Sequence, residues 1–273
     1  MKYKLIACDL DETLLNDHKN IGEKTQKAIT KIQQLDIKFV PATGRGYRSV
    51  KQTLKQIGTW DQRNQYVISY NGSVVVENYH QQIIKKTLLS FDKIEKLFQI
   101  GLKFQVPMHI YTMDQVFVFR PDADEINYLD RGGANYQIFE QPKIDFLRDQ
   151  PLVKILYKDL NRSKLVQIYR DIPQNLLNKI SATFSSNRYL EFNEIGVNKG
   201  RGLLELAEIL KIQPKEIVAI GDNTNDLSMI KVAGLGIAVQ NATPDVKNAA
   251  TYITQADYKH DAVSEAIEKF ILN

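Results

Sequence analysis

An apolar run that ends in two acidic residues, close to the start of the chain, constrains the fold most. Residues 4–8 read Lys-Leu-Ile-Ala-Cys, and Asp9 and Asp11 follow, one residue apart. A run of this length is typical of a strand buried on both faces of a parallel sheet. Open α/β sheets bind their ligands at the carboxyl ends of such strands. Two neighbouring carboxylates repel each other, so leaving both uncompensated would raise the pKa of one or require a cation, and we therefore expect a metal.

Three further apolar strands are predicted, and polar side chains follow each of them. The strands cover residues 37–40, 66–70 and 217–220, and segments with helical periodicity, such as 22–35 and 47–57, lie between strands. This alternation predicts a doubly wound parallel sheet with a Rossmann-like α/β fold. Because parallel strands end at one edge of a sheet, we expect their polar groups to converge, and carboxylate and amide oxygens favour Mg²⁺. The polar groups at these ends, together with a lysine that opens a helix, are Thr43, Asn71, Lys199, Asp222, Asn225 and Asp226.

The middle of the chain has a different pattern of elements. Neighbouring strands predicted in pairs, with return helices, indicate a separate α+β domain inserted into the first fold. We therefore expect a catalytic core of residues 1–84 and 190–273 and an inserted cap of residues 85–189, with hinges near 84–88 and 191–197. The cap holds 16 Lys and Arg against 12 Asp and Glu, which accounts for the whole net charge of +4. This surplus suits a lid over an anionic substrate, and it equally suits a solvated basic face without a function.

Composition argues against several classes of protein. The lysines are scattered, without basic runs interleaved with aromatic residues, so we expect no nucleic acid partner. No apolar run approaches the roughly 18 residues that cross a bilayer, and the first residues do not resemble a signal peptide. We therefore expect a cytoplasmic protein without a membrane partner. Cys8 is the only cysteine, so no intrachain disulfide is expected, and a buried apolar role suits it better than a catalytic thiol.

Four short motifs, in order along the chain, resemble those of a known superfamily. They read Asp9-Leu10-Asp11-Glu12-Thr13-Leu14-Leu15, Ala42-Thr43-Gly44-Arg45, Asn198-Lys199-Gly200 and Gly221-Asp222-Asn223-Thr224-Asn225-Asp226. The residues of these motifs and their order along the chain resemble the four motifs of the haloacid dehalogenase (HAD) superfamily. The long insertion after the third strand is similar to the cap of Cof-type phosphatases. The resemblance spans essentially the whole chain, and four ordered motifs are far more specific than a lone Asp-x-Asp.

The resemblance implies a HAD-type phosphatase, a phosphoric monoester hydrolase that works through an aspartyl-phosphate intermediate. It implies that Asp9 is the nucleophile and that Asp11 is the general acid and base. The implied Mg²⁺ ligands are the carboxylates of Asp9 and Asp222 and the backbone carbonyl of Asp11, with Asp226 completing or bracing the metal site. The residues implied to contact substrate or its phosphoryl group are Leu10, Thr43, Gly44, Arg45, Lys199 and Asn225.

The resemblance also implies a substrate class, namely small soluble phosphomonoesters such as sugar phosphates or phosphorylated cofactors, with the cap selecting among them. We expect a monomer or a weak homodimer. A phosphotransferase or phosphomutase would use the same residues, and a catalytically silent phosphate-binding regulator would tolerate the loss of Asp11. A dehalogenase needs neither a protonated leaving group nor Mg²⁺, which would leave Asp11 and Asp222 without a role.

Individual residues of these motifs also have a purely structural interpretation. Thr43, Asn225 and Asp226 could cap the helices that follow them, and Lys199 could be a solvated helix lysine. Arg45 could equally contact substrate or lie on the surface. Asn71-Gly72 could be a plain turn.

Glu12 departs from the family pattern, because glycine is usual at this position. A helical turn there would accept glutamate, whereas a positive φ would strain it.

Overall fold

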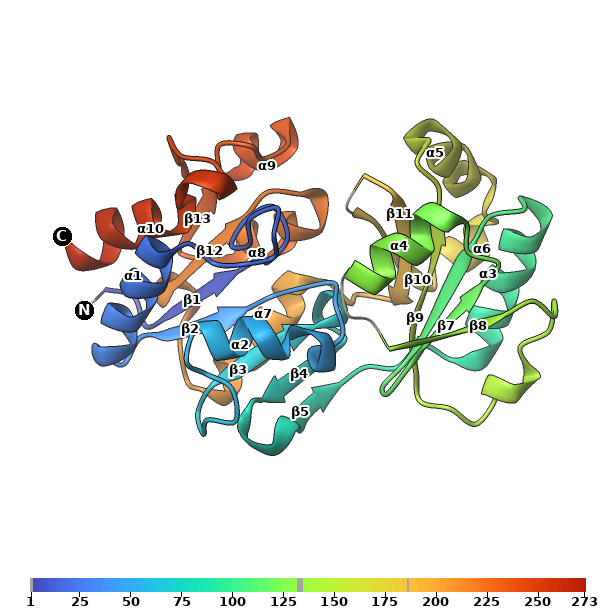
Figure 1. Ribbon diagram of the computed structural model, residues 1–273, viewed down its shortest axis with the longest axis horizontal. Helices are drawn as coiled ribbons and strands as arrows, with labels where there is room; N and C mark the ends of the chain where they lie inside the picture. The colour runs from blue at the N-terminus through green and yellow to red at the C-terminus, as the bar shows by residue number, and fades with distance from the viewer. Residues whose placement is uncertain (1, 132–134, 186) are drawn as a thin grey trace. The chain divides into compact units, whose positions relative to one another are not determined.

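The computed structural model describes residues 2–131, 135–185 and 187–273, and the chain divides into two compact units. Unit 1 consists of the residues up to Lys86 together with Asn198–Asn273, and unit 2 is Thr87–Val197. The second boundary therefore lies at 197/198 and not at the predicted 189/190. Figure 1 shows the elements of both units along the chain.

Unit 1 is built on a five-stranded sheet in the order β14-β13-β12-β1-β2, and every pairing in it is parallel. β1 lies between β12 and β2, because Leu5 pairs with Ile217 of β12 on one side and with Lys38 of β2 on the other. All side chains of β1 are buried, as expected for a strand covered on both faces. The predicted doubly wound α/β core is thus confirmed. The strands are β1 (Leu5–Cys8), β2 (Lys38–Pro41), β12 (Ile217–Gly221), β13 (Leu235–Ala238) and β14 (Tyr252–Ile253).

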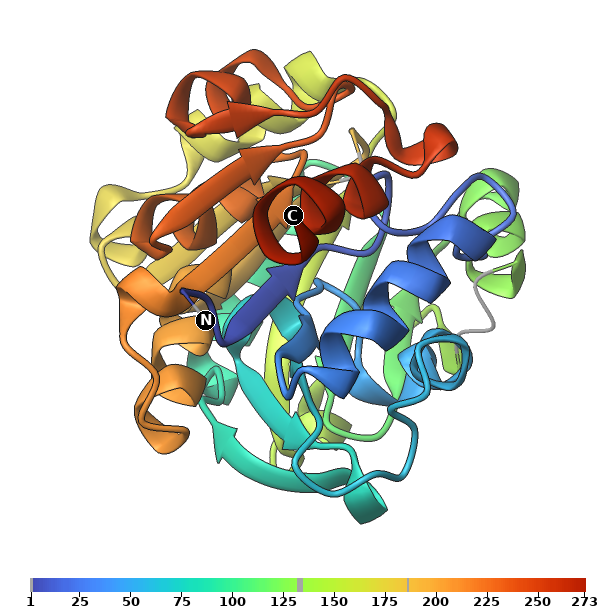
Figure 2. The same cartoon turned by 90° about the vertical axis from the view of Figure 1, so that its left-hand side faces the viewer.

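Helices cover both faces of this sheet. Figure 2 shows α1 and α10 together on one face and α7 and α8 together on the other. The helix predicted over residues 47–57 begins as a 3₁₀ turn (Tyr47–Val50) and continues as α2. The helices of unit 1 are α1 (Glu23–Gln34), α2 (Lys51–Gln56), α7 (Lys199–Ile209), α8 (Leu227–Val232), α9 (Pro244–Ala249) and α10 (Ala262–Ile267). Across the described part of the chain, no helix combines the length and apolarity needed to cross a bilayer.

A second sheet of unit 1 is antiparallel and consists of β3 (Tyr66–Ser69), β4 (Val74–Glu77) and β5 (Gln82–Lys86). It joins the first sheet through a single parallel bridge between Ala42 and Ile68. This bridge places the turn after β3 beside the loop that follows β2. β5 then leads directly into unit 2.

Unit 2 contains a six-stranded sheet in the order β10-β11-β9-β6-β7-β8, in which only the β7-β8 pair is parallel. β11 belongs to this sheet and not to the core, because it pairs with both β9 and β10. The strands are β6 (Met108–Thr112), β7 (Val116–Phe119), β8 (Tyr136–Phe139), β9 (Leu152–Lys158), β10 (Ile180–Ser185) and β11 (Tyr189–Glu194). The helices are α3 (Phe91–Lys103), α4 (Ala123–Arg131), α5 (Arg162–Asp171) and α6 (Gln174–Leu177).

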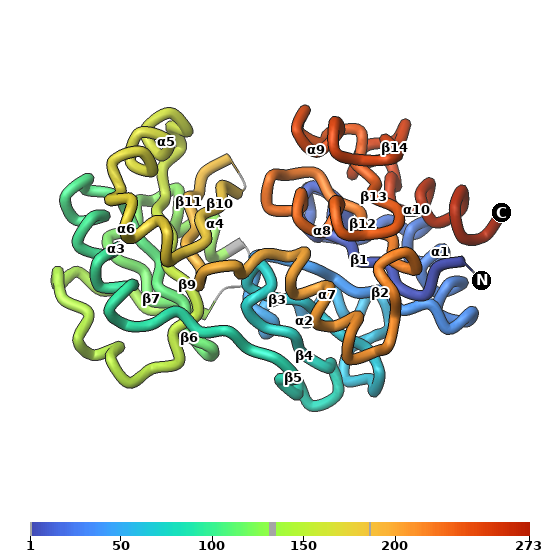
Figure 3. Tube along the Cα trace, turned by 180° about the vertical axis from the view of Figure 1, so that it is seen from behind, coloured from blue at the N-terminus to red at the C-terminus, as the bar shows by residue number. Residues whose placement is uncertain are grey.

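One face of this sheet packs against α3 and α5 and forms a separate apolar core. Ile94 and Phe98 of α3, Ile155 of β9 and Leu165 of α5 lie in one buried cluster whose members all come from unit 2. Figure 3 shows the trace of these elements from the opposite side. The predicted α+β module therefore has its own hydrophobic core.

Candidate active site

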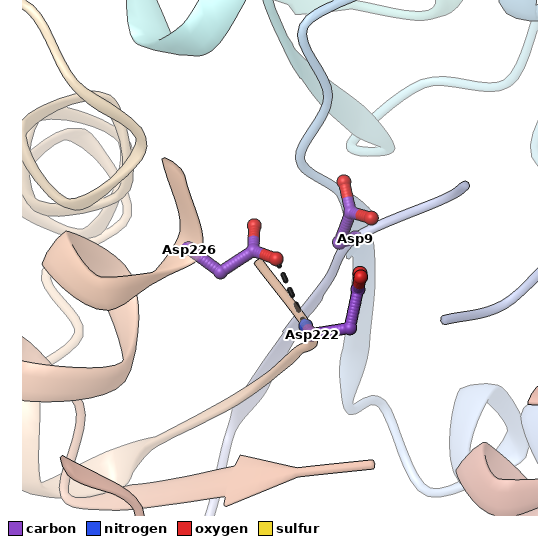
Figure 4. Close-up of side chains that lie close together, drawn as sticks. All are labelled: Asp9, Asp222 and Asp226. Carbon is purple, nitrogen blue, oxygen red and sulfur yellow. Dashed lines mark hydrogen bonds between the residues drawn. The ribbon is translucent and has the colours of Figure 1, made fainter. Parts of the chain in front are cut away.

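Three buried aspartates come together at the carboxyl ends of β1 and β12. Asp9 follows β1 and Asp222 follows β12, and the N–H of Asp9 donates to the carbonyl of Ile220 across the strand pair. Asp226 ends the 3₁₀ turn Thr224–Asp226. One carboxylate oxygen of each aspartate lies within 4.8 Å of those of the other two, and Figure 4 shows the three side chains around one point. The predicted convergence of residues 9, 222 and 226 is therefore present in the geometry.

Lys199 lies among these carboxylates and is fully buried. Its ammonium donates to Asp9 Oδ1 and, at 2.6 Å, to Asp226 Oδ1. The lysine reaches this position because α7 and α8 approach closely at Gly200, where a Cβ would lie 2.4 Å from the carbonyl oxygen of Ser228. A side chain at residue 200 would push the first turn of α7 away and withdraw Lys199 from the acids.

Asp226 uses both of its carboxylate oxygens within the protein. Oδ2 accepts the backbone N–H groups of Asp222 and Asn223, each at 3.0 Å, and Oδ1 accepts the ammonium of Lys199. These bonds fix the loop that carries Asp222. They suit bracing of a metal site better than direct ligation.

The buried charges of this cluster do not balance, because three carboxylates face one ammonium. Burial raises the pKa of Asp9 to about 7, and the charges of Asp226 and Asp11 add to this against the opposing effect of Lys199. Burial, together with Asp9 and Asp226, also raises the pKa of Asp222. A cation would relieve this repulsion. The available donors are carboxylate oxygens, which fit a hard divalent ion such as Mg²⁺.

Asp11 has the opposite environment. Arg45 holds it through two hydrogen bonds, with Nε 2.8 Å from Oδ2 and the second nitrogen on Oδ1, and Lys19 Nζ lies 2.7 Å from Oδ1. Burial alone would raise the pKa of Asp11, but the charges and hydrogen bonds of Arg45 and Lys19 outweigh it and lower the pKa to about 2. The pKa values of Asp9 and Asp11 are therefore far apart, because burial dominates at Asp9 whereas Arg45 and Lys19 dominate at Asp11.

The loop after β2 brings the second motif to the same edge of the sheet. Thr43 is buried, and its hydroxyl oxygen accepts the N–H of Arg45 at 3.0 Å, which bends the chain around Gly44. The carbonyl of Thr43 in turn accepts the N–H of Asn71 at 2.9 Å. Asn225 Nδ2 lies 3.3 Å from Asn71 Oδ1, so the second and fourth motifs meet through Asn71.

Asn71-Gly72 is thus a turn that lies between the second motif and the start of α7. Asn71 has a φ of 56°, and Gly72 has a φ of 94°. A Cβ on Gly72 would lie 2.2 Å from the carbonyl oxygen of Asn198, so only glycine allows this turn to contact the start of α7. Leu10, the remaining predicted contact residue, is buried after β1, where its carbonyl accepts the N–H groups of Leu14 and Leu15.

Two residues contact the acids although no role was predicted for them, namely Thr13 and Lys19. Thr13 donates its hydroxyl to Asp222 Oδ1 at 2.8 Å, and its place in the first motif was an available signal. Lys19 contacts Asp11 from a polar loop, where a single lysine does not indicate a functional role.

Glu12 has a φ of 60°, so of the two conformations considered for this position it adopts the strained one with positive φ. Asn241 Nδ2 donates to the carbonyl of Glu12 at 2.8 Å.

A central strand that ends in an Asp-x-Asp pair, facing a buried lysine and two further aspartates, defines a class of α/β hydrolase. The family model of haloacid dehalogenase-like hydrolases matches residues 6–267, and the chain belongs to this family. The match confirms the predicted superfamily and, together with the relatives described next, the predicted enzyme class, a HAD-type phosphatase.

Individual relatives are similar over their whole length. The Bacillus subtilis protein YxeH is 30% identical over 274 residues, which is 99% of both chains. The Bacillus subtilis 5-amino-6-(5-phospho-D-ribitylamino)uracil phosphatase YcsE is 28% identical over 270 residues, which is 98% of this chain and 96% of YcsE. A crystal structure of a haloacid dehalogenase-like hydrolase from Bacteroides thetaiotaomicron has a TM-score of 0.83 at 30% identity, covering 98% of this chain and 99% of that chain.

Proposed function

We propose that this protein is a Mg²⁺-dependent phosphomonoester hydrolase that forms an aspartyl-phosphate on Asp9. The observation that carries the proposal is the buried cluster in which Lys199 bridges Asp9 and Asp226 while Asp222 adds a third carboxylate. Such a cluster is costly unless it binds something, because desolvated like charges destabilise the fold. An oxygen-ligated cation and a phosphoryl group would together complete it.

The carboxylates of Asp9 and Asp222 and the backbone carbonyl of Asp11 would hold the Mg²⁺ ion. Asp226 would brace the loop that carries Asp222, and the hydroxyl of Thr13 would orient the Asp222 carboxylate. When bound, the ion would neutralise charge on the nucleophile and on the phosphoryl oxygens.

The chain's own residues account for both half-reactions. An oxygen of Asp9 attacks phosphorus, the bond to the ester oxygen breaks, and Asp11 gives its proton to the departing alcohol. Asp11 then takes a proton from water, the resulting hydroxide attacks phosphorus, and Asp9 is released with inorganic phosphate. Lys199 stays beside the reacting carboxylate, where a fixed positive charge stabilises the transition state.

Arg45 has two possible partners in this scheme. In the free protein it acts with Lys19, and more strongly than Lys19, to hold Asp11 as a carboxylate, which opposes the role of Asp11 as an acid. A phosphoryl group bound by Thr43 and Gly44, next to Arg45 in the chain, would compete for the same guanidinium. We infer that Asp11 accepts its proton only after Arg45 has moved to the substrate.

The proposed substrates are small phosphorylated metabolites, either sugar phosphates or phosphorylated cofactors. The name of YcsE supports this class, since it describes a phosphatase of a small phosphorylated ribitylamino compound. Unit 2 would select among these substrates, with Leu10 and Asn225 contributing to the phosphoryl site. We further propose a cytoplasmic protein, monomeric or weakly dimeric, without nucleic acid or membrane partners.

The test is a panel of phosphorylated metabolites assayed for released phosphate with Mg²⁺ and with excess EDTA. We expect turnover with Mg²⁺, its loss in EDTA and its return when Mg²⁺ is restored. Asp11→Asn should lower turnover by about 10² to 10⁴ because it removes the acid and base, with the far-ultraviolet circular dichroism unchanged. Asp171→Asn, an exposed aspartate in unit 2, is the matched control and should behave as wild type.

Three results would contradict the proposal. Turnover that survives EDTA would exclude the metal. Phosphate transferred to an added sugar, with little free phosphate, would indicate a phosphotransferase. Binding of inorganic phosphate without turnover of any compound, unaffected by Asp11→Asn, would indicate a regulator without catalysis.

A further inference from the structure

The loop between β1 and α1 is held in a fixed conformation by its own hydrogen bonds. Asn16 Oδ1 accepts the N–H groups of His18 and Asn20, at 3.0 and 3.1 Å. The N–H of Asn16 donates to the carbonyl of Asn20, and the N–H of Lys19 donates to the carbonyl of Asn16, both at 2.9 Å. Lys19 has a φ of 60°, which residues other than glycine rarely adopt. The loop therefore keeps Lys19 in a strained backbone conformation.

A second set of bonds ties the end of this loop to α2. Gln56 Nε2 donates to Asn20 Oδ1 at 2.8 Å, and Gln56 Oε1 accepts the N–H of Ile21 at 2.9 Å. Gln56 therefore fixes the end of the loop against the body of unit 1, so the position of Lys19 is set by the fold.

This loop conformation brings the side chain of Lys19 into contact with Asp11. Lys19 Nζ lies 2.7 Å from Asp11 Oδ1, while Arg45 covers Oδ2 and shares Oδ1. An exposed ion pair contributes little to stability by itself. Here the backbone is strained and the loop is bonded at both ends. Strain of this kind persists only where the surrounding structure enforces it, as the hydrogen bonds of Asn16 and Gln56 do here.

We propose that Lys19 is a positioning residue for Asp11, which keeps the carboxyl group in place when Arg45 turns to the phosphoryl group. This inference rests on the proposed function, because it needs Asp11 to transfer a proton to the leaving group. Arg45 has a competing partner once substrate is bound, whereas Lys19, which contacts the Oδ1 atom that Arg45 shares, is held by its own loop. Without Lys19, Asp11 would lose its remaining anchor during proton transfer and adopt several rotamers.

The test compares two substrates that differ in their need for a proton. p-Nitrophenyl phosphate has a leaving group that departs as a stable anion, whereas the alcohol of glycerol phosphate needs protonation. With Lys19→Met, which keeps the length of the side chain and removes its charge, we expect kcat/KM for glycerol phosphate to fall about tenfold. We expect kcat/KM for p-nitrophenyl phosphate to fall less than about twofold, because this parameter reports only the steps up to the departure of the leaving group. Lys19→Arg should restore most of the loss.

Controls separate this inference from the proposed function and from misfolding. Lys27→Met, at an exposed lysine of α1 that pairs with Glu23, should leave both rates unchanged, and all variants should melt at the wild-type temperature. Equal losses of kcat/KM on both substrates, or no loss on either, would overturn the role of Lys19 while the proposed function stands. A wild-type protein that hydrolyses neither these two substrates nor any compound of the metabolite panel would overturn the proposed function and this inference together.

Discussion

Glu12 shows how a single residue can be strained by the site next to it. It lies between Asp11, which turns towards Arg45, and Thr13, whose hydroxyl reaches Asp222. The chain achieves both contacts with a φ of 60° at Glu12. Its negative charge also contributes to the raised pKa of Asp222, although burial and the other aspartates contribute more.

We therefore expect Glu12→Gly to stabilise the protein. A non-glycine residue in the left-handed region costs about 1–2 kcal/mol, and glycine loses about 0.5–1 kcal/mol more backbone entropy on folding. The net gain should be about 0.5–1 kcal/mol in the free energy of unfolding, measured by urea denaturation. Glu12→Ala is the control, because it removes the charge but keeps the strain. If alanine stabilises as much as glycine, the charge and not the backbone is responsible.

At the scale of residues, the sequence predicts the site where each side chain follows a strand end. Asp9, Asp222 and Asp226 converge as expected because β1 and β12 are parallel neighbours, and Lys199 joins them because α7 begins beside α8. The partners of Asp11 are not predictable in this way. Lys19 reaches it through a loop whose conformation depends on Gln56, a residue of α2 that carries no signal of its own.

Among the elements, β6 of unit 2 carries a fully buried ionisable side chain, that of His109. Nε2 of His109 lies 3.3 Å from Glu125 Oε1 of α4. Burial lowers the pKa of His109 to about 3, and the positive charges of Lys154, Lys158 and Arg188 act in the same direction. The ring is therefore neutral in the folded protein at pH values where it is protonated in the unfolded chain.

This difference predicts a loss of stability in acid. The pKa of His109 is lower in the folded protein than in the unfolded chain, where it is about 6.5. The contribution of the neutral ring to the free energy of unfolding is therefore complete above that pH, and it is lost as the pH falls towards 3. Between about pH 7 and about pH 4, the loss from this group should reach about 3 kcal/mol in the free energy of unfolding. His109→Gln should reduce the difference between urea titrations at these two pH values.

Glu125 provides the control for this prediction. Burial raises its pKa, against the opposing effects of Tyr189 and Arg188, so its protonation favours the folded state as the pH falls. Glu125→Gln should therefore steepen the loss of stability in acid, whereas His109→Gln should flatten it. An unchanged pH dependence in His109→Gln would show that other groups dominate the titration.

The existence of most elements follows from local patterns, whereas their membership of a sheet does not. The strand near residue 189 is visible in the sequence, yet its assignment to unit 2 depends on Tyr189–Glu194 pairing with β9 and β10. Such pairing is a tertiary property, and it moves the boundary between units from residue 189 to residue 197.

For the whole molecule, the separate cores of the two units carry a prediction about folding. The apolar cluster between the unit 2 sheet and helices α3 and α5 draws its members only from residues 87–197. The ends of unit 1 that flank it are close, since Lys86 pairs with Val74 and Asn198 contacts Gly72. Unit 2 is thus an insertion between two adjacent points of unit 1.

Residues 87–197, expressed alone, should therefore fold cooperatively. We expect a single urea transition by circular dichroism and dispersed amide signals by nuclear magnetic resonance, because the domain has its own buried core. Unit 1 with residues 87–197 replaced by a short Gly-Ser linker is the matched deletion variant and should also fold. A gradual, non-cooperative transition of the isolated 87–197 segment would contradict the independence of unit 2.

The position of β1 between β2 and β12 has a consequence for synthesis on the ribosome. Leu5 pairs with Ile217, so at about 5–20 residues per second β1 waits roughly 10 to 40 s for its second neighbour. During that interval unit 2 emerges complete and can fold, while the acidic end of β1 remains unassembled. The nascent chain would thus acquire its inserted domain first, and its catalytic centre only when translation is almost finished.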